Sequence, residues 1–202
     1  MTTSTKTVSR RSTSHKTRLD TAKDELETES PRLSLQVDPQ RDHIQGPVNV
    51  ALTLVEYGDY QCPYCGAAYP EVKKVQKELG QKLRFVFRNF PLTRIHEYAL
   101  NAAETAEAAS AQGKFWEMHD FLYEHQSTLN DPKVALAFAR KIGLDTERFQ
   151  RELSQHNYQS RIKQDFDSGI RSGVNGTPTF YVNGVRHDGD PTARELVRAL
   201  GK

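Results

Sequence analysis

Hydrophobic and polar positions along the chain predict strands that alternate with helices. Residues 33–37 alternate apolar with polar side chains and predict a short strand. Residues 50–57 are almost continuously apolar, which is typical of a central strand buried on both faces. Residues 83–90 alternate again and predict a further strand, while residues 62–79 fit a helix that ends at Gly80. This strand–helix–strand order is the unit of a parallel sheet.

Helical patterns dominate the middle of the chain. Residues 96–112 are rich in alanine and contain neither glycine nor proline, and residues 114–125 place apolar side chains at helical spacing. Asp131 followed by Pro132 predicts a helix start, because proline is favoured at the first helical position. The other expected helices begin at residue 145 and cover residues 158–172 and 192–200.

A hairpin is predicted between the last two helices. Residues 179–182 and 185–187 flank Asn183-Gly184, a dipeptide that is typical of two-residue turns between antiparallel strands. The chain therefore returns to strand after its long helical region.

The first thirty residues differ in composition from the rest. No aromatic residue precedes Tyr57, residues 1–18 carry basic side chains without an acid, and residues 20–29 are acidic. A segment this polar cannot bury enough apolar surface to offset the entropy lost on ordering. We expect residues 1–32 to form a disordered polar tail and residues 33–202 to form the globular domain.

Charge and hydropathy limit the partners and the location. Arg10-Arg11 suggests an export signal, but no apolar segment follows it, and no run is long enough to span a bilayer. The net charge of +2 gives no reason to expect nucleic acid or an acidic membrane as the main partner. These observations predict a cytoplasmic protein without a nucleic-acid or membrane partner. A nucleic-acid-binding arm and an organelle transit peptide remain alternatives for the tail.

The two cysteines of the chain, Cys62 and Cys65, have three competing interpretations. A structural zinc site usually has four ligands, and the pair supplies two with no second cysteine or histidine pair nearby. A structural disulfide across so short a loop would contribute only about 2 kcal/mol. A redox dithiol fits better, because cysteines three apart on a helix have Cβ atoms about 5–6 Å apart and a modest adjustment allows a bond. No metal is expected.

The position of the cysteines favours redox chemistry. Cys62 follows a buried strand where a helix begins, and unpaired N–H groups and the helix dipole stabilise a thiolate there. A cysteine with a pKa near 8.5 is only about 3% ionised at neutral pH, whereas one lowered to about 6 is about 90% ionised. We expect Cys62 to be the nucleophile and Cys65 the resolving thiol. Pro63 suits an early helical position, where its missing N–H would be unpaired anyway.

A second candidate position is Thr177-Pro178, before the hairpin. A cis bond there would leave the backbone of Thr177 free to face the cysteines and hold a partner strand. An ordinary trans proline at the start of an edge strand is the alternative, and the residues alone leave both open.

Three segments together resemble the DsbA-like thioredoxin family, in the family's order. They are residues 55–65 (Val-Glu-Tyr-Gly-Asp-Tyr-Gln-Cys-Pro-Tyr-Cys), 113–120 (Gly-Lys-Phe-Trp-Glu-Met-His-Asp) and 176–180 (Gly-Thr-Pro-Thr-Phe). The resemblance covers residues 33–202. It implies an α/β thioredoxin-like fold with an inserted helical domain at about residues 92–172, and a cis bond before Pro178. It also implies that Glu56 is a buried acid that assists proton transfer at Cys65. No cofactor beyond a Cys62–Cys65 disulfide is implied.

The chain departs from the family at Pro63-Tyr64, which differs from the Pro-His pair of strongly oxidising members and resembles the glutaredoxin dipeptide. With a potential of about −210 mV in a cytosol at about −260 mV, the dithiol is favoured by about 2.3 kcal/mol. We therefore expect a reductase or thiol-exchange role over an oxidase role. Expected partners are thiol or disulfide proteins, with glutathione or a thioredoxin-type protein as recycling partner.

Two rival functions remain open at this point. A glutathione-dependent transferase or isomerase on a related fold would not need Cys65. A non-catalytic interaction module, with the tail as its binding element, would show no disulfide reductase activity.

Overall fold

A computed structural model describes residues 1, 2 and 30–201, and the fold lies within residues 31–201. Residues 3–29 of the expected polar tail lie outside the described residues. In the part that is described, no helix is long and apolar enough to cross a membrane.

A five-stranded sheet, in the order β1-β3-β2-β4-β5, forms the centre of the fold. Its strands are β1 (His43–Gln45), β2 (Leu52–Gly58), β3 (Leu83–Asn89), β4 (Thr179–Val182) and β5 (Val185–His187). Strands β2 and β3 pair in parallel, and the other neighbours pair antiparallel. The predicted parallel unit and the hairpin at Asn183-Gly184 are both confirmed.

The alternation of side chains along β2 assigns each residue to one face of the sheet. Leu54 belongs to the larger hydrophobic core, and Val55 and Tyr57 belong to a second core. The first face is covered by α2 (Pro63–Leu79) and α8 (Ala193–Leu200), and the second by α7 (Gln159–Ser172). Glu56 and Gly58 lie two and four positions after Leu54 in the strand, so they are on the same face of the sheet. Both therefore face the larger core, on the side of α2.

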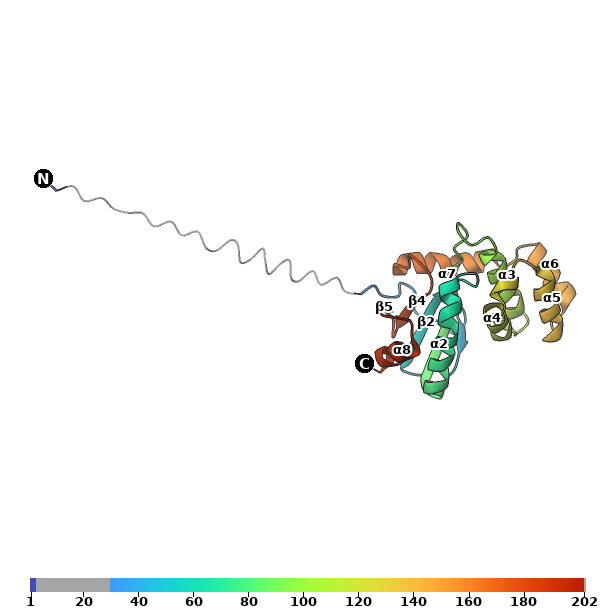
Figure 1. Cartoon of the computed structure of the whole chain (residues 1–202), viewed down its shortest axis with the longest axis horizontal. Coiled ribbons are helices and arrows are strands. Elements are labelled where there is room, and N and C mark those ends of the chain that lie inside the picture. Colours follow the sequence, from blue (N-terminus) through green and yellow to red (C-terminus); the bar gives the residue numbers. More distant parts are fainter. Residues whose placement is uncertain (3–29, 202) are drawn as a thin grey trace. The chain divides into compact units, whose positions relative to one another are not determined.

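A run of helices separates β3 from β4, as the family resemblance implies. Figure 1 shows these helices beside the sheet, with α7 returning to it. They are α3 (Ala99–Ser110), α4 (Phe115–Glu124), the short 3₁₀ helix η2 (Gln126–Thr128), α5 (Pro132–Lys141), α6 (Thr146–Ser154) and α7. Asp131 and Asp145 cap α5 and α6 by accepting hydrogen bonds from backbone N–H groups of the first turn. The expected α/β thioredoxin-like fold with a helical insertion is confirmed.

The short strand expected over residues 33–37 is wrong, since this segment lies outside the sheet and only the preceding residue, Arg32, makes an isolated bridge, to Val185. Arg88 of β3 explains the difference. Its guanidinium donates hydrogen bonds to the carbonyls of Leu35 and Gln36 at 3.0 and 3.2 Å, so these groups do not join a ladder. The sequence analysis did not predict β1, because its three residues are too few for a periodic signal.

Arg88 is itself completely buried, and it ties this segment to the second core. It donates to both carboxylate oxygens of Asp42 at 3.0 Å and to the Tyr57 hydroxyl at 2.8 Å. Burial alone would raise the pKa of Asp42, but hydrogen bonding to Arg88 and its positive charge hold that pKa below the usual range. The result is a buried ion pair whose loss would leave several polar groups without a donor.

Replacing Arg88 with leucine should therefore lower the free energy of unfolding by about 3 kcal/mol or more, because a buried carboxylate and two carbonyls lose their donors. Denaturant unfolding measures the change. The matched control is Arg84→Leu, since Arg84 bonds Thr53 and Val48 from a half-exposed position and its loss should cost about 1 kcal/mol or less. Equal losses in the two variants would contradict the structural role given to Arg88.

Candidate active site

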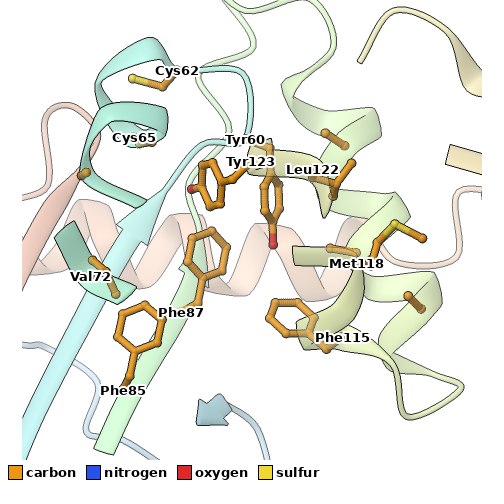
Figure 2. Close-up of a cluster of buried hydrophobic side chains, with 14 of the residues drawn as sticks. Tyr60, Cys62, Cys65, Val72, Phe85, Phe87, Phe115, Met118, Leu122 and Tyr123 are labelled. Atoms are coloured by element: carbon orange, nitrogen blue, oxygen red, sulfur yellow. The ribbon is translucent and has the colours of Figure 1, made fainter. Parts of the chain in front are cut away.

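Cys62 and Cys65 lie where β2 has ended and α2 begins. Cys62 is the residue before the helix, with extended backbone angles, and Pro63 is at the first helical position. Both cysteines are free thiols, and both are buried, at 3% and 0% exposure. Figure 2 shows them on the first turns of α2, above the aromatic side chains of the larger core. The structure thus brings the pair together in the position that the sequence predicts.

Cys62 is held in an environment that favours its thiolate. The largest effect is a hydrogen bond from the Cys65 thiol, and burial opposes it. The Thr177 side chain and then the backbone N–H groups of Cys65 and Tyr64 act in the same direction as the Cys65 thiol. Together they lower the pKa of Cys62 to about 5. These N–H groups are those that a helix leaves unpaired at its start, so the helix terminus supplies the site's positive potential.

Cys65 is in the opposite situation. Burial, hydrogen bonding to Cys62 and the charge of Glu56 raise the pKa of its thiol. Its sulfur accepts a hydrogen bond from the Asp59 backbone N–H at 3.5 Å. One sulfur of the pair is therefore ready to attack at neutral pH, while the other keeps its proton until a base removes it.

Glu56 is the base candidate, and its carboxyl is buried in the larger core at 2% exposure. Burial, followed by repulsion from the charge on Cys62, raises the pKa of Glu56 to about 8. One of its oxygens, Oε1, finds no hydrogen-bond partner among residues 30–201. A carboxyl with these properties can hold or release a proton close to neutral pH.

The segment before the hairpin reaches the same place. The peptide bond between Thr177 and Pro178 is cis, as the family resemblance implies. The Cys62 thiol donates a hydrogen bond to the Thr177 carbonyl at 3.3 Å, across 115 positions of sequence. Tyr64, between the cysteines, is 75% exposed and presents its ring to solvent.

Several residues that support the site were missed by the sequence analysis. The side-chain amide of Gln126 donates to the carbonyls of Tyr60 and Cys62 at 2.8 and 3.0 Å. It lies so close to Gly66 that a Cβ there would be 2.1 Å from its Oε1. No local pattern marks Gln126, because its partners lie more than sixty positions earlier in the chain.

Asp59 is the second missed residue, and it fixes the turn before Cys62. One carboxylate oxygen accepts the Gln61 backbone N–H at 2.7 Å, and the other accepts from the Leu92 N–H and from His96 Nδ1 at 2.8 Å each. An aspartate directly after a strand is a common turn residue, so a signal for it was present. Within the described residues, no group of three or more histidine, cysteine or acidic side chains could hold a metal ion.

A buried cysteine pair at a helix start, with a buried acid and a cis-proline segment beside it, defines the class of thiol–disulfide sites. A family model described as thioredoxin matches residues 39–202. The chain belongs to the thioredoxin family, and its fold is that of the DsbA-like oxidoreductases.

Solved structures agree with this assignment. A thioredoxin-like oxidoreductase from Silicibacter pomeroyi DSS-3 is 32% identical, with a TM-score of 0.70, over 81% of this chain and 92% of that one. BdbD from Bacillus subtilis has a TM-score of 0.71 at 23% identity and covers 85% of this chain and all of its own. At that identity the second likeness shows the fold alone.

The curated relatives carry a different name. A Na(+)/H(+) antiporter NhaA 1 from Salinispora arenicola is 46% identical over 168 residues, which are 83% of this chain and 26% of that protein. A Na(+)/H(+) antiporter NhaA from Herminiimonas arsenicoxydans is 38% identical over 81% of this chain and 26% of its own length. The chain thus spans about a quarter of the length of the curated relatives it matches.

These relatives correct one prediction. The expected cytoplasmic location is contradicted by the curated relatives, which are named as Na(+)/H(+) antiporters. That expectation depended on the lack of an apolar segment after Arg10-Arg11 and of a run long enough to span a bilayer.

The geometry predicts how the two thiols react with an alkylating agent. The thiolate fraction of Cys62 rises as the pH passes its pKa, so its alkylation rate should reach half its maximum near pH 5 and level off by about pH 7. Mass spectrometry of the reduced protein should find Cys62 modified and Cys65 protected.

Two variants of Cys65 test how much its thiol contributes to the lowered pKa of Cys62. Cys65→Ala removes the hydrogen-bond donor and should raise the midpoint by about one to two pH units, whereas Cys65→Ser keeps a donor and should raise it less. A wild-type midpoint near the ordinary cysteine value of about 8.5 would contradict the described electrostatics.

Proposed function

We propose that this protein exchanges disulfides with protein or small-thiol partners, with Cys62 as the nucleophile and Cys65 as the resolving thiol. The observation that carries the proposal is the opposite shift of the two thiol pKa values, lowered to about 5 at Cys62 and raised at Cys65. A structural disulfide or a metal site would not need two thiols of such different acidity.

The reaction follows in two steps. The Cys62 thiolate attacks a partner disulfide, an S–S bond forms to one partner sulfur, and the other partner sulfur leaves as a thiolate. Cys65 then gives its proton to Glu56 and attacks the Cys62 sulfur. The Cys62–Cys65 disulfide forms as the bond between Cys62 and the partner breaks, and the second partner sulfur also leaves as a thiolate. The two partner thiolates take up protons, one from Glu56 by way of solvent and one from solvent, so the partner is released as a dithiol with two electrons from this protein. The reverse sequence oxidises a partner dithiol.

Thr177, Pro178 and Tyr64 are proposed to hold the partner. The Thr177 carbonyl accepts the proton of the Cys62 thiol at 3.3 Å. When Cys62 ionises, that carbonyl loses its donor and can accept a backbone N–H of a partner strand. The exposed ring of Tyr64 offers an apolar surface next to the reacting sulfur. No cofactor beyond the cysteine pair enters this proposal.

The direction of exchange depends on the partner and on the redox poise around it. A low pKa of Cys62 stabilises the dithiol relative to the disulfide, because the thiolate exists only in the reduced protein. We propose the dithiol as the resting form, with glutathione or a thioredoxin-type protein as the recycling partner. A cytosolic redox poise does not support the reductase direction, because the curated relatives contradict a cytoplasmic location.

Insulin reduction by dithiothreitol tests the proposal. Wild type should accelerate the reaction, Cys62→Ser should reduce the rate to background, and Cys65→Ser should stop turnover while it accumulates a mixed disulfide with its substrate. Cys65→Ser that keeps full activity with glutathione would support the transferase alternative instead. Inactive but folded wild type would support the interaction module.

A further inference from the structure

Besides Oγ1 of Thr177, two buried polar atoms close to the cysteines have no hydrogen-bond partner in the described part of the chain, and both lie in the larger core. One is Oε1 of Glu56, and the other is the hydroxyl of Tyr123, which comes from α4 of the helical insertion. Both atoms are fully buried, and neither has a hydrogen-bond partner in the described part of the chain. An unpaired buried polar group is costly, so a pair of them in one core points to a shared role.

Strand geometry places both groups over the same stretch of β2. Glu56 and Gly58 are two residues apart and project from the same face. A Cβ built on Gly58 would be 2.7 Å from the Tyr123 hydroxyl and 2.4 Å from the ring of Phe87. The hydroxyl therefore lies against β2 one side-chain position beyond Glu56, and glycine at residue 58 is what admits it.

The Tyr123 ring is fixed by its neighbours. It packs at 4.9 Å from Tyr60, 5.3 Å from Tyr69 and 5.0 Å from His119, measured between ring centroids. Figure 2 shows Tyr123 beside Tyr60, below the turn that carries the cysteines and above Phe87. A ring enclosed on these sides can hold its hydroxyl in one place without a hydrogen bond of its own.

Cys65 is the third member of this group. Burial, then the charge of Cys65 and then that of Glu56 raise the pKa of Tyr123, so its hydroxyl stays protonated near neutral pH. A protonated phenol can donate a hydrogen bond to a carboxylate. That donation favours the charged carboxylate over the neutral acid, which partly offsets the penalty of burial.

We propose that Tyr123 is a positioning residue for proton transfer, and that its hydroxyl donates through one bound water to the Glu56 carboxylate. The proton moves from the Cys65 sulfur to Glu56, and the water and the phenol hold the carboxylate in place for it. No electrons move in this step. The inference rests on the proposed function, since Cys65 gives up its proton only in the exchange cycle.

The other titratable groups around this pair are accounted for. They are Cys62 just before α2, Tyr69 on α2, Asp59 and Tyr60 in the turn after β2, and His119 on α4. Burial lowers the pKa of His119, so the imidazole is neutral near pH 7, and burial raises those of Tyr60 and Tyr69. In a mixed disulfide the Cys62 sulfur carries no charge, so that state isolates Glu56 and Cys65.

The test follows the rate at which Cys65 releases a fluorescent small thiol from a preformed mixed disulfide on Cys62, as a function of pH. In wild type the rate should rise with pH as Glu56 becomes a carboxylate. Tyr123→Phe should move this rising limb upward by about one pH unit and slow release about tenfold below it, because the carboxylate loses a donor. In a Glu56→Gln background, Tyr123→Phe should have no further effect.

The matched control is Tyr60→Phe, which removes a neighbouring buried hydroxyl that bonds His119 Nδ1 at 3.1 Å. The rate of thiol release in Tyr60→Phe should rise over the same pH range as in wild type. If Tyr123→Phe does not fold, a fluorotyrosine at residue 123 keeps the ring and strengthens the donor, and should move the limb to lower pH. An unmoved limb in the folded Tyr123 variant, or an equal effect in the Glu56→Gln background, overturns the inference alone. Wild type that releases no thiol at any pH overturns the proposed function with it.

Discussion

The negative charge that Cys62 carries above about pH 5 is held at the end of a buried strand, where little water reaches it. Charge in such a place needs donors that are fixed before the charge appears. The start of α2 supplies them, through the N–H groups of Tyr64 and Cys65 and through the Cys65 thiol. Pro63 has no N–H to contribute and begins the helix at that point.

Much of the surrounding structure serves to keep this turn in place. Gln126, in the helical insertion, donates hydrogen bonds to two carbonyls of the turn. Asp59, within the turn, accepts hydrogen bonds from the Leu92 N–H and from His96. The insertion is therefore connected to the cysteines by specific hydrogen bonds as well as by apolar packing. Through Tyr123 the insertion also reaches the face of β2 that carries Glu56. The proposed proton donor, Cys65, and the proposed acceptor, Glu56, therefore both lie next to residues of the insertion.

The sequence was informative where the cause of structure is local. The apolar run before Cys62, the glycine after residue 79 and the aspartate caps predict β2, α2, α5 and α6 because each depends on neighbouring residues. The strand predicted over residues 33–37 does not form, because Arg88, more than fifty positions away, donates hydrogen bonds to the carbonyls of Leu35 and Gln36. Gln126 and Tyr123 could not be foreseen for the same reason, since only the fold brings α4 and its following turn to the strand. The resemblance supplied the cis bond at Pro178, which the residues alone left open.

The central claim is that the thiolate of Cys62 stabilises the reduced fold. Its pKa of about 5 lies below that of an unfolded cysteine, so the stabilisation is complete above the unfolded value and is lost as the pH falls through about 5. The disulfide form has no thiolate and lacks this contribution. The direct measurement is the free energy of unfolding of both forms between about pH 7 and pH 5. The reduced form should lose stability relative to the disulfide form by up to about 1.4 kcal/mol per pH unit. A difference between the two forms that does not change with pH would contradict the account.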